Sequence, residues 1–271
     1  RAEAIKIARA GGKLPSYLKL EPGHELISGR NPVLEAVRAG VPLTRVFMVS
    51  GNTTDERVEE AARLAASQGA PVIEVTRGHL DVMTEKAAHQ GIAIEVPPYD
   101  YESLDDVIET IALTGTPGLI LALDSVTDPH NLGAVLRSAS AFNAHAVLIT
   151  ERRSAGVTGT VWKVSAGAAA RVPIARETNL VRSLQQLKEN GYFVVGLAGE
   201  GDVMLDNLEL ADMPLVLVTG SEGKGLSRLV RETCDQICSI PISGDMESLN
   251  AAVATGIALY EVDRIRRKGT R

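Results

Sequence analysis

Apolar and polar positions alternate in short blocks over the first third of the chain. The spacing of these blocks predicts helices at 32–39, 55–68 and 78–84 and strands at 45–50, 71–75 and 91–96. Asn31 followed by Pro32 is typical of an N-cap and a first helical residue, so we expect the first helix to begin there. Pro97 and Pro98 cannot continue a central strand, and they mark the end of a small α/β unit.

A different pattern begins beyond Gly115 and Pro117, where continuous apolar runs replace the alternation. Such runs are typical of strands buried on both faces, and therefore of a mostly parallel sheet with helices on both faces. The expected strands are 118–123, 146–150, 193–197, 214–219 and 237–242, and the expected helices are 131–142, 178–189, 226–232 and 248–265. The fold class is thus α/β, with a second, smaller α/β domain in front.

Composition between the two patterns indicates a boundary. Five acidic residues and no basic residue lie between 99 and 113, where Ile108 and Ile111 supply apolar anchors, and this favours a connecting helix. We therefore expect a basic N-terminal extension at 1–21, a small domain at 22–98, a linker at 99–117 and a larger domain at 118–271.

Charge is unevenly distributed along the chain. The formal net charge is −6, and the chain contains only one Trp, five Tyr and three Phe. On composition alone these values disfavour an RNA partner, because stacking on bases requires aromatic side chains and phosphates attract basic surfaces. However, five basic residues stand among the first twenty and five among the last eight. These ends are interpreted either as solvated tails or as contacts to nucleic acid.

Cys234 and Cys238 are the only cysteines, and Pro241 occupies the place of the third cysteine of a radical iron–sulfur motif. We interpret them as two reduced thiols of a cytoplasmic protein without a metal site. No apolar run approaches the roughly 20 residues of a membrane span, and no signal segment begins the sequence.

Three strand-to-loop junctions of the larger domain are rich in glycine and polar residues, namely 124–137, 218–226 and 240–250. Ligands of open α/β sheets bind at such junctions. Gly223-Lys224 is not a phosphate loop, because Val218 and Gly225 replace its first Gly and its Ser or Thr. The glycines of 196–201 stand in the wrong order for a dinucleotide site, and Ser221 lacks the preceding glycine of a nucleophile elbow.

The three junctions read Asp-Pro-x-Asn-x-Gly-x-x-x-Arg at 128–137, Gly-x-Glu-Gly-x-Gly-Leu at 220–226 and Ile-Pro-x-x-Gly-x-x-x-Ser-Leu-Asn-x-x-x-Ala at 240–254. Together they resemble the motifs of the SpoU/TrmH family of ribose 2′-O-methyltransferases, which use S-adenosylmethionine. The small residues at 165–170 also match a stretch of that family. Residues 22–96, which open with the phrase at 24–33, resemble the RNA-recognition domain of its ribosomal-RNA branch.

The resemblance implies a C-terminal trefoil knot, a homodimer whose knotted faces complete each active site, and a cofactor pocket built by the knot loops. The positions that match the cofactor contacts are Leu197, Ala198, Gly199, Gly220, Ile240, Ile242 and Leu249. Glycines alone would equally suit a tight turn, so the assignment depends on the resemblance.

The resemblance also implies the catalytic residues, which are Asn131, Arg137, Glu222, Ser248 and Asn250. Arg137 is either a general base or a clamp on a neighbouring phosphate. The clamp is the easier role, because a guanidinium pKa above about 12 makes deprotonation costly. Ser248 is either catalytic or a cap of the last helix, and His130 is interpreted as a solvated loop histidine.

The basic residues expected to contact RNA are Lys13, Lys19, Arg30, Arg38, Arg152, Arg153, Lys163 and Arg171. Since aromatic residues are scarce, recognition is expected to depend on phosphates and RNA shape. We expect transfer of a methyl group from S-adenosylmethionine to a ribose 2′-OH of 23S ribosomal RNA, at a guanosine. The alternatives are an antibiotic-resistance methyltransferase for another rRNA nucleotide, a base methyltransferase, and a catalytically silent ribosome-assembly factor.

Overall fold

The computed structural model describes residues 14–51, 55–244 and 248–269. Contacts within the chain divide it into two compact units, Arg1–Tyr99 and Asp100–Arg271. Lys13 lies outside the described residues. Along the described ranges, no helix is long and apolar enough to cross a membrane.

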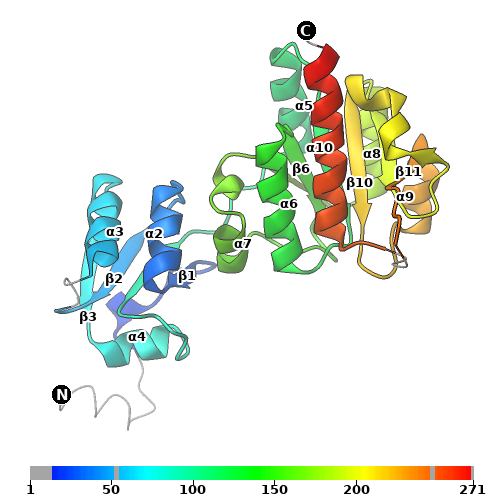
Figure 1. Cartoon of the computed structure of the whole chain (residues 1–271). Coiled ribbons are helices and arrows are strands. Elements are labelled where there is room, and N and C mark those ends of the chain that lie inside the picture. Colours follow the sequence, from blue (N-terminus) through cyan, green and yellow to red (C-terminus); the bar gives the residue numbers. More distant parts are fainter. Residues whose placement is uncertain (1–13, 52–54, 245–247, 270–271) are drawn as a thin grey trace. The chain divides into compact units, whose positions relative to one another are not determined.

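The first unit is a four-stranded sheet with helices (Figure 1). The sheet order is β1 (Glu25–Ser28), β4 (Ile92–Val96), β2 (Arg45–Val49) and β3 (Val72–Val75). Strand β4 is antiparallel to both neighbours, and β2 is parallel to β3. The helical elements are η1 (Ser16–Leu18), α2 (Arg30–Arg38), α3 (Glu56–Ser67) and α4 (Arg77–Met83). Strand β1 was not predicted, because it has only four residues and only one of them is buried.

Helix α2 begins before the expected N-cap. Its N-cap is Gly29, whose φ of 101° is a conformation that favours glycine. The Asn31 side chain does not cap the helix; its Oδ1 accepts a hydrogen bond from Nη1 of Arg57 at 2.9 Å. The prediction of Asn31 as the N-cap was therefore wrong, because a residue distant in sequence supplies its partner.

The second unit contains a seven-stranded sheet in which all described pairings are parallel. Its order is β7 (Ile174–Glu177), β6 (Ala146–Thr150), β5 (Leu119–Asp124), β10 (Leu215–Gly220), β8 (Phe193–Leu197), β11 (Gln236–Ser239) and β9 (Val203–Met204). The expected α/β fold is confirmed. Strands β7 and β9 were missed because they are short segments at the two sides of the sheet.

Helices cover both faces of this sheet. They are α5 (Leu104–Leu113), α6 (Pro129–Ala141), α7 (Gly159–Val164), α8 (Leu180–Glu189), α9 (Arg228–Thr233) and α10 (Ala251–Gly269), with short turns η2 (Ala168–Ala170), η3 (Leu205–Asn207) and η4 (Glu209–Asp212). Figure 1 shows α6 and α10, which contact each other, side by side in front of the sheet.

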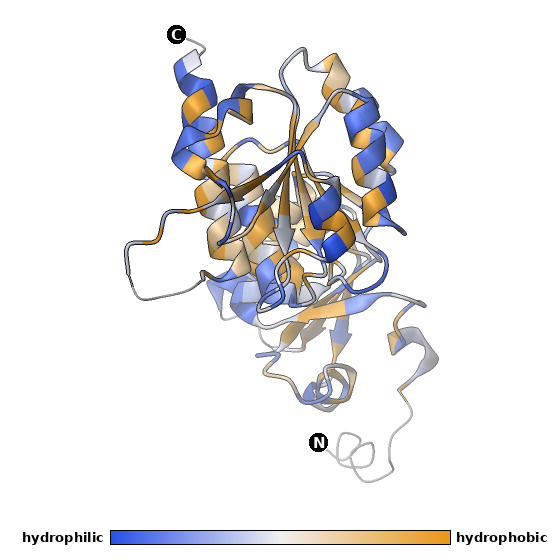
Figure 2. Ribbon diagram, turned by 90° about the vertical axis from the view of Figure 1, so that its right-hand side faces the viewer, coloured by the Kyte–Doolittle hydropathy of each residue, from blue (hydrophilic) through white to orange (hydrophobic). Residues whose placement is uncertain are grey.

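Successive side chains of each strand point to opposite faces of the sheet, so each face has its own apolar layer. Ile120, Ala122, Val216 and Val218 belong to a cluster with buried residues of α5, α8 and α9. Each fully buried aliphatic side chain contributes about 1.5–3 kcal/mol to stability. Figure 2 shows hydrophobic strands at the centre of this unit and mixed hydrophilic and hydrophobic positions on the flanking helices.

The segment expected as a linker packs within the second unit. Leu104, Val107 and Ile111 of α5 are buried in the cluster described above. Glu102 forms a parallel β-bridge to Ala175, which belongs to β7. Residues 100–117 therefore begin the second unit rather than stand between the two units.

The basic residues of α10 bind partners inside their own unit. Arg264 pairs with Glu261, and Arg267 pairs with Asp263. Arg266 donates to main-chain carbonyl oxygens of Pro117, Gly118, Ala211 and Met213. Burial lowers the pKa of the Arg266 guanidinium. Arg266 thus attaches the last helix to the rest of the unit, whereas the pairs of Arg264 and Arg267 lie within the helix itself, an outcome that neither solvated tails nor RNA contacts anticipated.

Candidate active site

The three motifs meet where four parallel strands end. Strands β5, β10, β8 and β11 are consecutive in the sheet. Strands β5, β10 and β11 lead into the three motifs, and β8 leads into residues 198–201. A cavity of about 390 Å³ opens there. Its lining includes all seven positions expected to contact a cofactor, which are Leu197, Ala198, Gly199, Gly220, Ile240, Ile242 and Leu249. The size lies within the range of small-molecule sites.

Gly220 is required by the close approach of the loop that follows it. A Cβ atom at this position would lie 2.1 Å from the carbonyl carbon of Gly225. The loop folds back because Ser221 and Gly225 exchange two main-chain hydrogen bonds of 3.1 and 2.9 Å. Gly223 and Gly225 have φ values of 77° and 63°, which only glycine adopts readily. The tight turn and the cavity wall are therefore one structure.

The walls of the cavity suit a cofactor with a neutral ring. Leu197, Leu226, Ile240 and Leu249 provide apolar surface, and the glycines leave main-chain groups accessible. Glu200 also lines the cavity, where its carboxylate pairs with Arg231. The hydrogen bond from Arg231 contributes to lowering the pKa of Glu200, after hydrogen bonding to its own main chain. Apolar side chains with a few polar groups are the usual lining for an adenosine-sized ligand.

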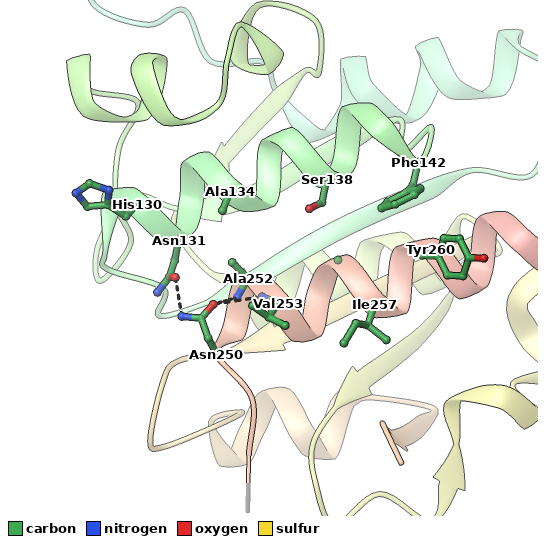
Figure 3. Close-up of a pocket in the computed structure, with 11 residues that line it drawn as sticks. His130, Asn131, Ala134, Ser138, Phe142, Asn250, Ala252, Val253, Ile257 and Tyr260 are labelled. Carbon is green, nitrogen blue, oxygen red and sulfur yellow. Dashed lines mark hydrogen bonds between the residues drawn. The ribbon is translucent and has the colours of Figure 1, made fainter. Parts of the chain in front are cut away.

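Three polar side chains, one from each motif, join beside this cavity. Nδ2 of Asn250 donates to Oδ1 of Asn131 at 3.0 Å and also to the carboxylate of Glu222. Asn131 is buried within α6, whereas Glu222 is exposed on its loop. Figure 3 shows Asn131 and Asn250 pointing toward each other from α6 and the start of α10. The motifs are thus connected by hydrogen bonds as well as by proximity.

Asn250 is also the residue that caps α10. Its Oδ1 accepts from the main-chain N–H groups of Ala252 at 2.9 Å and Val253 at 3.2 Å. Ser248 lines the cavity but stands two residues before this cap. The structural alternative for Ser248, a cap of the last helix, is therefore wrong.

Arg137 lies on a different part of the surface. It is exposed on α6 and lines neither the cavity nor the groove between α6 and α10. None of the described residues accepts a hydrogen bond from its guanidinium. Gly133, which precedes it in the same motif, allows close packing, since a Cβ there would lie 2.7 Å from Cβ of Val164. The motif thus places Arg137 on a helix that α7 holds firmly.

The groove between α6 and α10 has a volume of about 630 Å³. His130 is exposed at its end, as expected, but it lies in the first turn of α6 and not in a loop (Figure 3). Val253, Ile257 and Tyr260 of α10 line it, although 50%, 38% and 49% of their surfaces remain exposed.

The expected RNA contacts separate into paired and unpaired groups. Arg30 pairs with Asp55 at 2.7 Å, and Arg38 forms two hydrogen bonds with Glu60 at 2.8 and 2.7 Å. Hydrogen bonds from Arg57 hold the pKa of Asp55 well below its ordinary value. The other described members are exposed without a side-chain partner among the described residues: Lys19, Arg152, Arg153, Lys163 and Arg171.

The side chain of Thr150 stabilises the Arg152-Arg153 turn by hydrogen bonds. Oγ1 of Thr150 donates to the carbonyl oxygen of Arg152 at 2.6 Å and contacts Oγ of Ser154 at 2.8 Å. Arg153 has a φ of 62°, so the turn requires a left-handed residue. The two guanidinium groups are therefore presented on an ordered turn.

Several cavity residues were missed by sequence reasoning. They are Thr219, Ser221, Gly223, Lys224, Gly225, Leu226, Glu200, Arg231, Cys238, Ala251 and Ala254. Leu226 and Ala254 stand in the quoted motifs, so the motifs carried a signal for them. Cys238 carried none, because it faces the cavity only through the register of β11.

The two free thiols are partly buried at Cys234 and buried at Cys238. Burial raises the pKa of both Cys234 and Cys238 to about 11, so both stay protonated. Within the part of the chain that the structure describes, no three His, Cys, Asp or Glu side chains form a metal-binding group.

Known proteins resemble this chain over nearly its whole length. An uncharacterized tRNA/rRNA methyltransferase of Mycobacterium sp. (strain KMS) is 53% identical over 243 residues, which are 90% of this chain and 77% of that protein. One of Mycobacterium ulcerans (strain Agy99) is 51% identical over 264 residues, 97% of this chain and 84% of that protein.

Solved structures share the fold. The SpoU methyltransferase AviRb from Streptomyces viridochromogenes is 24% identical, with a TM-score of 0.73 over 97% of this chain and 93% of that one. An AdoMet-bound rRNA methyltransferase from Sinorhizobium meliloti is 25% identical, with a TM-score of 0.68 over 90% of this chain and 88% of that one.

Two family profiles match the two units in order. Residues 26–102 match the RNA 2′-O ribose methyltransferase substrate-binding domain, and residues 118–260, more than half of the chain, match the SpoU rRNA Methylase family. With relatives above 50% identity over most of their length, the assignment is complete. The chain belongs to the SpoU rRNA Methylase family.

Proposed function

We propose that this enzyme transfers the methyl group of S-adenosylmethionine to a ribose 2′-OH of 23S ribosomal RNA, at a guanosine. The observation that carries the proposal is the junction of the three motifs, where Asn131, Glu222 and Asn250 are hydrogen-bonded beside the cavity. The match of residues 26–102 to an RNA substrate-binding domain supports an RNA substrate. A cytoplasmic location and the roles of segments 1–21 and 22–98 stay predictions.

The cavity residues would hold the cofactor, whose chemistry when bound is that of a methyl group on an electrophilic sulfonium. Apolar contacts from Leu197, Ile240 and Leu249 would hold its neutral ring, while main-chain groups around Gly220 would orient it. The carboxylate of Glu222 would lie near its positive charge. Positioning of this kind supplies much of the rate of group-transfer reactions.

Arg137 would hold a phosphate next to the target ribose. Its guanidinium, exposed and unpaired among the described residues, can bind a phosphate through two parallel hydrogen bonds. A clamp of this kind fixes the 2′-oxygen in line with the methyl group. A guanidinium is a poor base, so the 2′-OH proton is lost to solvent as the oxygen–methyl bond forms and the bond from the methyl group to the sulfonium sulfur breaks.

We further propose a homodimer through the second unit. Arg137 lines no part of the cavity of its own chain, so we infer that a second copy brings its Arg137 there. The partly exposed Val253, Ile257 and Tyr260 offer an apolar surface for that copy. The trefoil knot at the C-terminal end stays a prediction from the family resemblance.

The proposal is tested by incubating the enzyme with S-adenosylmethionine and 23S rRNA and mapping the product by mass spectrometry of nuclease fragments. We expect one additional methyl group on the ribose of a guanosine. A methyl group on another rRNA nucleotide would indicate the antibiotic-resistance alternative, and one on a nucleobase would refute the 2′-O assignment. If calorimetry detects no binding at millimolar S-adenosylmethionine, the silent assembly factor is the better description.

A further inference from the structure

A carboxylate stands at the end of the most apolar strand of the second unit. Residues 119–123 of β5 are buried and apolar, and the strand ends with Asp124, which is 6% exposed. Burial of a charged group is costly unless its oxygens are satisfied. Within the described ranges, Asp124 has no lysine, arginine or histidine partner. The buried carboxylate of Asp124 must therefore be satisfied by hydrogen bonds rather than by an ion pair.

The oxygens of Asp124 bind the main chain and a neighbouring hydroxyl. Oδ2 accepts a hydrogen bond from the main-chain N–H of Ser227 at 2.6 Å, across 103 residues of sequence. Oδ1 accepts from Oγ of Ser125 at 3.2 Å. A hydrogen bond from a main-chain amide to a carboxylate is stronger than one between neutral groups. The carboxylate is thus attached to one defined point of another segment.

That point is the far end of the loop formed by residues 221–227. The near end is fixed by Gly220, which pairs with Asp124 in the register of β10 and β5. Between the two ends, the paired Ser221 and Gly225 close the turn. The loop is therefore tied at both ends to one residue, Asp124, at the carboxyl end of β5.

The loop carries groups of the proposed active site. Its residues line the cavity, and the Glu222 carboxylate accepts from Nδ2 of Asn250. Its tip, Gly223 and Lys224, is exposed, and the two hydrogen bonds of Gly225 go to Ser221 within the same loop. The position of Glu222 consequently depends on how the ends of the loop are held.

We propose that Asp124 is a positioning residue for methyl transfer. Through the N–H of Ser227 it holds loop 221–227 in the arrangement in which Glu222 reaches Asn250 and the cofactor cavity is closed on one side. The role rests on the proposed function, because Asp124 acts through the loop and touches neither substrate nor cofactor.

Three variants test this role in the full-length enzyme. Asp124→Ala removes the acceptor, Ser227→Pro removes the donor, and Asp124→Asn keeps an acceptor oxygen in nearly the same place. Proline suits position 227, because the φ of Ser227 is −64°. We expect Asp124→Ala and Ser227→Pro each to lower kcat about tenfold or more, since small displacements of reacting groups are costly. Asp124→Asn should recover most of this loss.

A double variant separates positioning from general damage. If Asp124 and Ser227 act through one hydrogen bond, Asp124→Ala combined with Ser227→Pro should lose no more than either change alone. The Kd of S-adenosylmethionine, measured by calorimetry, should rise about fivefold in both single variants. The KM for RNA should change less than twofold, because the loop is not among the basic RNA contacts.

Glu177 provides a matched control. It is also a carboxylate at a strand end, and it accepts a hydrogen bond from the main-chain N–H of Leu104 at 3.2 Å, but it lines neither hollow. Glu177→Ala should lower the melting temperature without changing kcat or the Kd of S-adenosylmethionine. Multiplied losses in the double variant, or a kcat loss in Glu177→Ala equal to that in Asp124→Ala, would overturn the role of Asp124. If the wild-type enzyme methylates no RNA, the proposed function fails instead.

Discussion

Two sets of arginines, one from each unit, differ in what their guanidinium groups contact. In the first unit, Arg30, Arg38, Arg45 and Arg57 bind carboxylates of Asp55, Glu60 and Glu95. In the second unit, Arg137, Arg152, Arg153 and Arg171 are exposed and have no side-chain partner among the described residues. The local sequence does not separate the two sets, because both lie among mixed polar and apolar residues.

The difference bears on how RNA can be held. An arginine that is already paired must lose its carboxylate contact before it binds a phosphate, so its net gain is small. An unpaired arginine gains the phosphate contact directly. We therefore expect the unpaired arginines of the second unit, rather than Arg30 and Arg38 of the first, to supply phosphate contacts, while the first unit contributes through shape.

The largest effect should follow from Arg137→Lys. Lysine keeps the charge but cannot make the bidentate contact, so the ribose loses its alignment. We expect kcat to fall at least about a hundredfold with RNA affinity unchanged within about twofold, as measured by single-turnover methylation and filter binding. Near-normal turnover would exclude both the clamp and the general-base role.

A paired arginine should affect stability instead. Glu95 is fully buried and accepts hydrogen bonds from Nε of Arg45 at 2.5 Å and from the main-chain N–H of Glu21 at 2.9 Å. Breaking a buried pair of this kind costs about 3 kcal/mol. Glu95→Gln should therefore lower the free energy of unfolding of the first unit at pH 7 by about that amount, as measured by denaturant titration.

The same pair should make the first unit sensitive to acid. Burial by itself raises the pKa of Glu95, but the hydrogen bonds from Arg45 and Glu21 and the charges of Arg45 and His24 outweigh it, so the pKa is lowered. Its stabilisation is present above the unfolded pKa of about 4.3 and is lost as pH falls through the lower folded pKa. The difference between wild type and Glu95→Gln should shrink across that range. An unchanged difference at pH 3 would contradict the assignment.

Removal of the two unpaired arginine side chains from the turn at Arg152 and Arg153 should weaken RNA binding moderately. Arg152→Ala combined with Arg153→Ala removes two exposed charges from an ordered turn. We expect the Kd for rRNA to rise about tenfold at low salt, and the salt dependence of binding to become shallower by about two counter-ions. Binding of S-adenosylmethionine is the control and should not change, since neither arginine lines the cavity.

The smallest effect is expected from Arg38→Ala. Its guanidinium is bound by Glu60 in two hydrogen bonds, so little of its charge is available to a phosphate. The Kd for rRNA should rise less than about twofold. A tenfold loss equal to that of the Arg152 and Arg153 variant would break the comparison between the units.

Much of the second unit could be predicted from neighbouring residues alone. The strands at 146–150 and 193–197 were predicted with their observed bounds, because continuous apolar runs of that length are typical of strands buried on both faces. The site positions came from the family resemblance, and the structure gathers the cofactor positions at one cavity because the ends of parallel strands meet at one edge of a sheet. Short segments such as β1 and β7 gave no such signal, because four residues carry too little periodicity.

The sequence by itself determined the strands, the helices and the residue types gathered in each motif, since these depend on neighbours along the chain. The tertiary structure decided which polar groups meet. Arg30 finds Asp55 across 25 residues, Asn250 finds Asn131 across 119, and Ser227 finds Asp124 across 103. The order of the strands sets these distances, and no local pattern records that order. For the same reason, only the fold shows which arginines remain available to RNA and which carboxylate holds the loop of the active site.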